Sequence, residues 1–249
     1  MAVALIGAGG RTGSLVLEQA RRRGWPVRAL VRSAGKLADG DALKVVVGDS
    51  RDSAAIDEVL VAPGGGPGTK VGTKVGAVIC TLGMHDITVP ATDFSDSVRA
   101  IVAGMQRHGV RRIVAVASAG ALDHPEGGYR SQHGQAEVYR HVAAEHVRNF
   151  ETLRASGLDW TLMCPLTLVG DIPASAAGST ASAGSVQWLY EDLPAGSGET
   201  GYADLARVMC DLLAERASYG KRVGIVSFRA GTGTGTSTGT GTSKKSSAP

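Results

Sequence analysis

A glycine-rich turn near the start of the chain has the residue spacing of a phosphate-binding loop. Residues 7–13 read Gly-Ala-Gly-Gly-Arg-Thr-Gly, and they connect an apolar segment at residues 2–6 to a helical pattern at residues 11–23. Glycines at this spacing allow a tight turn, close approach of the backbone to a diphosphate and close packing of the helix on the strand. The first N–H groups of the helix then face the phosphates. We therefore predict a dinucleotide site held by Gly7, Gly9, Gly10, Arg11, Thr12 and Gly13.

The residues after the second predicted strand, residues 27–31, indicate which dinucleotide binds. NAD-binding proteins usually place an acidic residue here to hold the ribose 2′-hydroxyl. This chain has Arg32 instead, and no acid precedes Asp39. Arg32 is able to donate in a forked geometry to a 2′-phosphate, with Arg11 and Lys36 sharing the charge. The alternative is that Arg32 is a solvated cation at a strand end, but the missing acid favours NADP(H).

Two further strand ends carry residues suited to the same ligand. Asp49 and Ser50 follow the predicted strand at residues 44–47, and Asp49 either accepts from the adenine amino group or is only a turn residue. Thr81, Leu82 and Gly83 close the strand at residues 77–82. Ligands of open α/β sheets bind in the crevice outside the carboxyl ends of the strands, so we predict that these residues contact the cofactor.

The elements that position these residues alternate along the chain. Apolar patterns predict strands at residues 2–6, 27–31, 44–47, 77–82, 112–117, 160–164 and 222–227, and helices at residues 11–23, 53–60, 93–108, 135–155 and 203–215. Strands that alternate with helices form a parallel sheet with helices on both faces, since right-handed crossovers allow little else. The predicted fold is therefore an α/β, Rossmann-type doubly wound parallel sheet in a single domain.

Two glycine-rich stretches stand apart from this pattern. Residues 62–76 contain six of the 35 glycines and predict a flexible insertion, and residues 229–249 predict a disordered Gly/Thr/Ser tail after a domain at residues 1–228. Four of the 26 basic residues lie at residues 62–76 and 230–249, so the remainder carries 22 basic against 23 acidic residues. A domain without a basic excess is not suited to nucleic-acid phosphates, and we expect no nucleic-acid partner.

The remaining composition limits the other partners. The three cysteines lie far apart inside apolar segments, which predicts buried, reduced thiols and no metal site. No apolar run approaches the roughly 20 residues that span a bilayer, and the long uncharged stretch at residues 172–190 is typical of a loop. The first predicted strand leaves no room for a targeting segment. We expect a cytoplasmic monomer or weak homo-oligomer with no membrane partner.

Taken in order, several of these segments resemble the atypical short-chain dehydrogenase/reductase superfamily of NAD(P)H-binding, NmrA-like proteins. The segments are GAGGRTG, LVRSAGKL, VVVGD, AVICTLG, RRIVAVASAG and LRASGLDWTLMCP. The resemblance extends over residues 1–61 and 77–171, fades over residues 172–201 and returns weakly over residues 202–227. Within the superfamily, EHVRN at residues 145–149 is most similar to the biliverdin-IXβ reductase/flavin reductase group.

The resemblance implies positions for catalytic residues. Ser118 occupies the place of the superfamily's catalytic serine near the nicotinamide, and the alternative is that it only caps the turn that follows. His146 either supplies a proton or contacts the substrate, or it lies on a helix face without a role. Pro165 and Leu166 are expected to wall the nicotinamide. The loop at residues 165–171 lacks the second histidine that the group often has.

One expected feature of short-chain dehydrogenases is missing. Their Tyr-x-x-x-Lys pair lowers the pKa of a phenol that moves the proton of an alcohol, but no tyrosine of this chain has a lysine four residues later. Hydride transfer itself needs only a positioned cofactor. We therefore predict an NADPH-dependent oxidoreductase that reduces a planar conjugated acceptor, a flavin or a biliverdin-like molecule. The alternatives are a non-catalytic NADP(H)-binding redox sensor, and a scaffold that has lost the cofactor.

Overall fold

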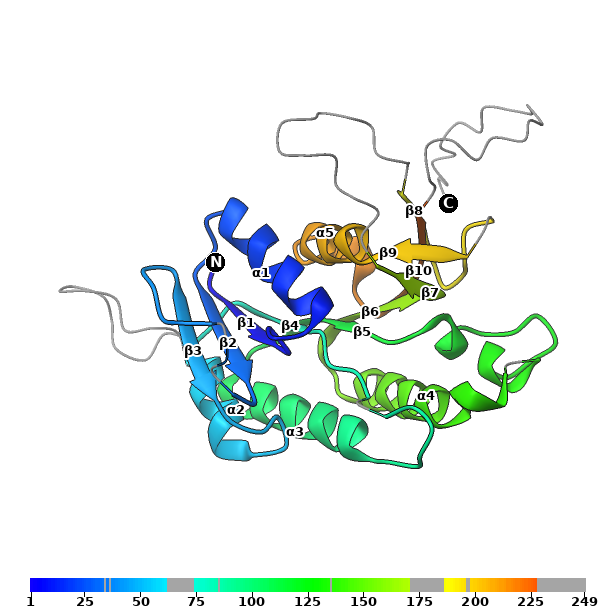
Figure 1. The fold of residues 1–249 in the computed structure, drawn as a ribbon, viewed down its shortest axis with the longest axis horizontal. Helices are drawn as coiled ribbons and strands as arrows, with labels where there is room; N and C mark the ends of the chain where they lie inside the picture. The colour runs from blue at the N-terminus through cyan, green and yellow to red at the C-terminus, as the bar shows by residue number, and fades with distance from the viewer. Residues whose placement is uncertain are drawn as a thin grey trace, which may run out of the picture.

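The predicted strands form one sheet in the computed structural model, which describes residues 1–33, 35, 37–61, 74–84, 86–134, 136–170, 186–195 and 198–227. Its strand order is β3-β2-β1-β4-β5-β6-β10-β8, and every pair is parallel except β10 with β8 (Figure 1). The strands are β1 (Val3–Ile6), β2 (Val27–Val31), β3 (Leu43–Val47), β4 (Ala77–Cys80), β5 (Arg112–Val116), β6 (Asp159–Pro165), β8 (Val186–Tyr190) and β10 (Lys221–Ser227). From β1 the chain moves outward to β2 and β3, then returns to β4 on the other side of β1. This is the predicted Rossmann-type doubly wound α/β fold, with its switch point between β1 and β4.

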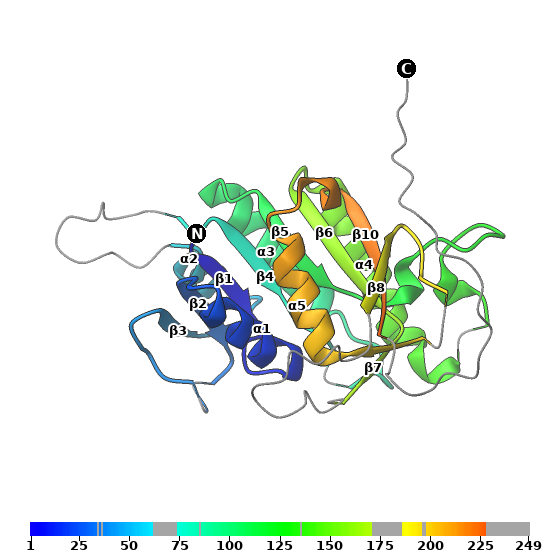
Figure 2. The ribbon, with the colours of Figure 1, turned by 90° about the horizontal axis from the view of Figure 1, so that it is seen from above.

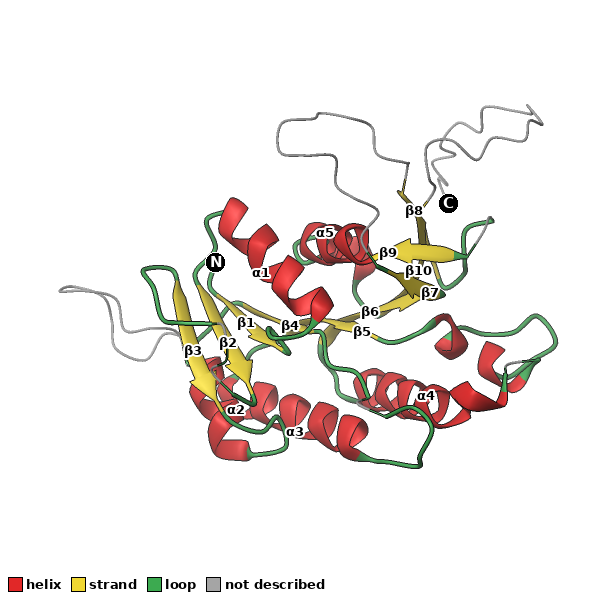
Figure 3. Cartoon of the chain, in the orientation of Figure 1, coloured by secondary structure: helices red, strands yellow, loops and turns green. Residues whose placement is uncertain are grey.

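Helices cover both faces of the sheet. The helices are α1 (Arg11–Arg22), α2 (Ser53–Leu60), α3 (Asp93–His108), α4 (Arg140–Ala155) and α5 (Tyr202–Leu212). Helices α1 and α5 lie side by side on one face, and α2, α3 and α4 cover the other (Figures 2 and 3). The same right-handed crossovers that make the sheet parallel place the helices in these two layers.

Each face of the sheet has its own hydrophobic core because successive strand side chains point to opposite faces. In β1, Val3 and Leu5 pack with α1 and α5, whereas Ala4 and Ile6 pack with α2, α3 and α4, and all four are buried. This explains why β1 is apolar throughout rather than alternating. Burial on both faces fixes the strand at the centre of the sheet, directly before the glycine-rich turn.

Several predicted boundaries differ from the observed ones. The helix predicted at residues 135–155 begins at Arg140, and Glu137–Tyr139 form a separate 3-10 turn. The cap predicted at Ser53 is wrong by one residue, since the carboxylate of Asp52 accepts from the N–H of Ala54 at 3.0 Å. The helix predicted to end at residue 215 ends at Leu212.

Strand structure also occurs where the sequence predicts a loop. Val186–Tyr190, within the stretch expected to be loop-like, is the edge strand β8 and pairs antiparallel with β10. A separate pair is formed by β7 (Thr167–Val169) and β9 (Glu199–Gly201). Such strands depend on a distant partner for their hydrogen bonds, and their own sequences contain little periodic signal.

The two glycine-rich stretches are described only in part. Residues 62–73 and 228–249 lie outside the described residues, so the predicted flexible insertion and tail stay predictions over those ranges. Residues 74–76 belong to the fold, because Val75 is buried and Gly76 donates from its N–H to the carbonyl of Ala2 at 2.8 Å. Among the described residues, none of the helices combines the length and the apolar character needed to cross a membrane.

A buried arginine anchors the loop between β5 and α4 to the sheet. Arg222 in β10 is only 6% exposed, and its guanidinium stacks on the ring of Phe150, 4.4 Å from the centroid. It donates to both carboxylate oxygens of Asp123, at 2.8 and 2.7 Å, and to Glu191 at 2.7 Å. A planar guanidinium suits this forked pairing. The backbone at Asp123 is therefore held against β10.

Candidate functional site

The glycine-rich turn is locked between β1, β4 and α1. Gly7 has a φ of +89°, and a Cβ at Gly13 would lie 2.1 Å from the carbonyl oxygen of Gly7. The hydroxyl of Thr81, after β4, donates to that carbonyl at 3.2 Å and to the carbonyl of Ile6 at 3.1 Å. Only glycine fits at residue 13, because any side chain would push α1 away from the turn.

Helix α1 points an uncapped N-terminus at this turn. Its N-cap residue is Gly10, which offers no side-chain cap, and no acidic residue lies in the first turn. The N–H of Ser14 bonds the carbonyl of Gly10 at 2.9 Å, so the N–H groups before it have no intrahelical acceptor. These groups and the helix dipole give the turn a positive potential that suits a diphosphate.

A groove of about 620 Å³ runs from this turn along the carboxyl ends of β1 to β4. Nine of the predicted cofactor residues line it: Gly7, Gly9, Gly10, Arg32, Asp49, Ser50, Thr81, Leu82 and Gly83. The other wall comes from the start of α3 and the loop before it, including Val89, Phe94 and Ser97. Residues that follow four different strands, β1 to β4, therefore line one groove, as the sequence predicts for these nine.

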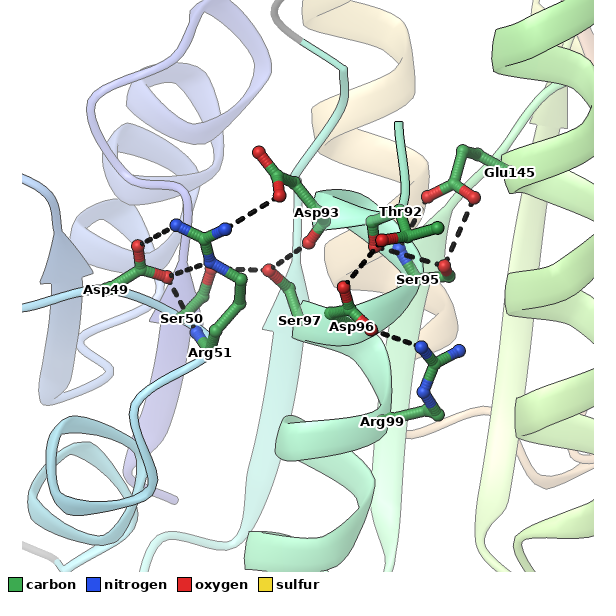
Figure 4. A network of polar contacts seen from close by, with 10 residues as sticks. All are labelled: Asp49, Ser50, Arg51, Thr92, Asp93, Ser95, Asp96, Ser97, Arg99 and Glu145. Atoms are coloured by element: carbon green, nitrogen blue, oxygen red, sulfur yellow. Dashed lines mark hydrogen bonds and ion pairs between the residues drawn. The ribbon is translucent and has the colours of Figure 1, made fainter. Parts of the chain in front are cut away.

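Arg51 also lines the groove and is missed by the sequence prediction (Figure 4). Its guanidinium binds the carboxylate of Asp49 at 2.6 and 3.0 Å and reaches Asp93 at the start of α3, at 2.7 Å. These bonds hold the pKa of Asp49 down to about 2. Asp49 is therefore ionised, and an adenine amino group would share it with Arg51. The sequence signal that could have identified Arg51 is its position two residues after Asp49, the acid at the end of the strand.

A second set of contacts fixes the start of α3 (Figure 4). Ser95 donates to the fully buried carboxylate of Glu145 in α4, from its N–H at 2.8 Å and from its hydroxyl at 3.1 Å. Arg148 pairs with the same carboxylate at 2.7 Å. Ser50, after β3, and Ser97, in α3, join their hydroxyls at 2.9 Å. These bonds hold α3 between β3 and α4, so the wall formed by Phe94 is positioned from both sides.

Of the two residues expected at a 2′-phosphate, Arg32 is described by the structure and Lys36 is not. Arg32 is exposed at the groove, and within the described residues it makes no hydrogen bond or ion pair. Lys36 lies outside the described residues. The guanidinium of Arg11 stacks on the ring of Tyr202 in α5, 4.6 Å from the centroid. Within the described part of the groove, Arg32 is thus a cation without a bonded acid, in contrast to Arg51, whereas Arg11 faces α5.

Ser118, Pro165 and Leu166 are not among the residues that line the groove. They follow β5 and β6, the strands next to β4, so they lie at the same carboxyl edge of the sheet. Ser118 is half-buried and its carbonyl accepts from the N–H of Ala121 in a 3-10 turn at 3.0 Å. Pro165, the last residue of β6, pairs with Ile225 of β10, and Leu166 is 44% exposed. These three residues therefore lie at the same edge of the sheet as the groove but do not line it.

His146 lies beside the groove wall in a neutral state. Its ring packs edge-to-face on Phe94, with centroids 5.6 Å apart, and its buried Nδ1 has no hydrogen-bond partner among the described residues. Burial lowers the pKa of His146 to about 4. At pH 7 the imidazole is therefore uncharged and is a poor reservoir of protons. Of the roles predicted for it, contact with a substrate through a neutral ring fits this environment better than proton supply.

The chain is similar to proteins of known family and fold. Residues 7–216 match the profile of a protein family described as NAD(P)H-binding. Among solved structures, a candidate exported protein of Burkholderia pseudomallei is 24% identical, with a TM-score of 0.71 and coverage of 92% of this chain and 100% of that one. A candidate NADH-flavin reductase of Streptococcus pneumoniae is 21% identical, with a TM-score of 0.67 and coverage of 92% and 100%. A short-chain dehydrogenase/reductase of Veillonella parvula, in complex with NADP, is 13% identical, with a TM-score of 0.65 and coverage of 90% and 93%. At these identities the likeness to the solved structures shows a shared fold.

The close contact between Gly13 and Gly7 predicts the effect of Gly13→Ala. The added methyl group would meet the Gly7 carbonyl, so we expect the free energy of unfolding to fall by about 1–3 kcal/mol. Dinucleotide affinity should fall as well, because the helix N-terminus moves away from the turn. Urea unfolding and a fluorescence titration with NADPH measure the two effects. Gly40→Ala is the matched control, since a Cβ there meets nothing within 4 Å. Equal behaviour of the two variants would contradict the steric argument.

Burial of His146 predicts a specific acid sensitivity. The folded pKa of about 4 lies below the unfolded value of 6.5, so the unfolded chain binds more protons between these values. The stabilising contribution is complete above pH 6.5 and is lost as the pH falls toward 4. We expect about 2 kcal/mol to be lost between pH 7 and pH 5.

Urea unfolding at both pH values tests this expectation. His146→Leu should lose much less stability on acidification than the natural chain, because leucine does not titrate. His141→Gln, on the same helix, is the control and should retain the full loss. If His146→Leu and the natural chain lose the same free energy, His146 is not the group that titrates.

Proposed function

The chain belongs to the NAD(P)H-binding family, within the atypical short-chain dehydrogenase/reductase superfamily, and on this basis we propose that it is an NADPH-dependent reductase of planar conjugated acceptors. The acceptor class is that of flavins and biliverdin-like tetrapyrroles. One observation carries the proposal: the uncapped, acid-free N-terminus of α1 faces a glycine-rich turn at the switch point of the sheet. A candidate NADH-flavin reductase with the same fold supports the reaction class.

Different residues of the groove would bind different parts of the dinucleotide. The glycine-rich turn and the first N–H groups of α1 suit the diphosphate, and Asp49 with Ser50 suits the adenosine. The remaining half of the cofactor would extend along the sheet edge toward Ser118 and Pro165. When bound, the dihydronicotinamide supplies a hydride to the acceptor, which takes its proton from solvent.

Arg32 makes NADPH the preferred cofactor. Among the described residues its guanidinium has no hydrogen-bond or ion-pair partner, so binding a 2′-phosphate would break no ion pair within that part of the chain. Asp49, one of the groove's acids, is already bound by Arg51 at 2.6 Å and is less suited to hold a ribose hydroxyl. The dinucleotide-binding fold with bound NADP in the Veillonella parvula protein is compatible with this preference.

The environments of Tyr129 and Tyr190, which lie outside the groove, favour a conjugated acceptor over a ketone that would be reduced to an alcohol. A tyrosine that moves the proton of an alcohol needs a lowered pKa, but Tyr129 donates its hydroxyl to Glu151 and its pKa is raised to about 12. Burial also raises the pKa of Tyr190. The described lysines are engaged elsewhere or lie far from the groove: Lys44 pairs with Asp39, and Lys74 donates to the carbonyl of Gly109. A conjugated acceptor does not require such a pair.

The reaction is tested by mixing the protein, NADPH and one acceptor at a time. Loss of absorbance at 340 nm with a flavin, a quinone or a biliverdin isomer is the expected result. Ser118→Ala should lower kcat by roughly 10-fold or more while NADPH affinity stays within twofold, since Ser118 is expected to orient the reacting groups. Tight NADPH binding without turnover of any acceptor, and a neutral Ser118→Ala, would instead indicate a redox sensor.

The cofactor preference is tested at Arg32. Arg32→Ala should weaken NADPH by about 1–3 kcal/mol, or roughly 5- to 150-fold, because a hydrogen bond between charged groups is lost. NADH affinity should change by less than twofold. Arg21→Ala, at the far end of α1, removes an exposed charge outside the groove and serves as the control. Equal losses of NADPH and NADH affinity in Arg32→Ala would contradict the assignment of the 2′-phosphate.

A further inference from the structure

A second cavity lies on the α4 side of the sheet and shares no lining residue with the groove. Its volume is about 510 Å³, and its lining residues are Asp123, His124, Gly127, Gly128, Tyr129, Phe150, Arg154 and Arg222. The loop between β5 and α4 forms one wall. This loop is attached to β10 at Asp123 by the buried Arg222, so its first residues have a defined position.

Three side chains of this loop gather their metal-binding atoms at the edge of the cavity. His124, Glu126 and His133 each offer one ring nitrogen or carboxylate oxygen, and these atoms lie within 4.8 Å of one another. Nδ1 of His133 is 3.7 Å from Oε2 of Glu126. Two ligands of a tetrahedral Zn²⁺ ion are roughly 3.4 Å apart, given bonds of about 2.0–2.2 Å. The pair is therefore close to the required spacing.

The hydrogen bonds of His133 select its free nitrogen. Nε2 lies 2.8 Å from the carbonyl oxygen of Gly127, and because a carbonyl only accepts, Nε2 must carry the proton. Nδ1 then holds the lone pair, and Nδ1 is the atom that faces Glu126. A histidine that donates its other N–H to a backbone carbonyl is the usual arrangement behind a metal ligand, since it fixes both the tautomer and the ring orientation.

His124 must turn for its lone pair to join the other two ligands. Its ring is stacked on His133, with centroids 3.7 Å apart and planes 8° from parallel. A metal ion lies in the plane of each ring that binds it, so two nearly parallel rings cannot share an ion. His124 is half-buried at the cavity edge, and its Nδ1 accepts only one bond of 3.2 Å from the N–H of Glu126. Rotation of this side chain therefore breaks one weak contact while Asp123 keeps the backbone in place.

We propose that His124, Glu126 and His133 bind a divalent transition-metal ion, Zn²⁺ or a close analogue. Imidazole nitrogens select such ions over Mg²⁺ and Ca²⁺, which prefer oxygen ligands. Three protein ligands leave a fourth position for water or another small ligand, on the side of the second cavity. The ion would join residues 124–126 to residue 133 and close the loop that leads into α4. The proposal differs from the expectation from the sequence that no metal binds.

Titration of tag-free, chelator-treated full-length protein tests the proposal. We expect calorimetry to detect one equivalent of Zn²⁺, and Co²⁺ to give the intense visible bands of a four-coordinate ion. His133→Ala and Glu126→Gln should each weaken Zn²⁺ at least 10-fold, and the double variant His124→Ala/His133→Ala should abolish stoichiometric binding. Glu126 is exposed, so Glu126→Gln removes a ligand charge with little risk to the fold.

His108→Gln is the matched control, because this histidine lies at the end of α3 and pairs with Asp57 instead. It should bind Zn²⁺ as the natural chain does. Circular dichroism and NADPH affinity should be unchanged in all variants, which separates this site from the groove. Absence of stoichiometric binding overturns the proposal. Binding that survives in the double variant also overturns it, since the ion would then be adventitious.

Discussion

The contact between α1 and the glycine-rich turn is the constraint on which the rest of the site depends. Gly13 leaves no space for a side chain against the Gly7 carbonyl, and Thr81 bonds the same carbonyl from the neighbouring strand. One turn therefore sets the distance of α1 from the sheet, the direction of its dipole and the position of the end of β4. A diphosphate needs all three at once, because it is bound by main-chain N–H groups that cannot adjust one by one.

The opposite wall of the groove is held by charges rather than by close packing. Arg51 joins the turn after β3 to the start of α3 through Asp49 and Asp93, and Glu145 joins the same end of α3 to α4. The first link is exposed, and the second is buried with its carboxylate fully bonded. An exposed ion pair contributes little stability, whereas removal of one partner of a buried carboxylate is costly. The groove is thus firmer on the α4 side than on the β3 side.

The local signals of the sequence predicted the fold and one side of the site well. The apolar patterns and the glycine spacing act over a few residues, so they predict β1, α1 and α3 closely. The strand β8 and the link from Arg51 to Asp93 depend on partners far along the chain, which no local pattern contains. The approach of the His124, Glu126 and His133 side chains to one another also depends on contacts that no local pattern contains. Their convergence follows from the ion pairs of Arg222 and from the backbone turns around Gly127.

The proposed reaction depends on where the hydride acceptor takes its proton from. His146 packs on Phe94 beside the groove wall and is neutral at pH 7, so it is not poised to supply a proton there. In the function that we propose, the hydride acceptor would stabilise the added electron pair within its own conjugated system and take its proton from water. Such a reaction would disfavour simple ketones more strongly than it would select among flavins, quinones and tetrapyrroles. Selection among these is left to shape, and the shape is set by the apolar wall around Phe94 and by the loops beyond β5 and β6.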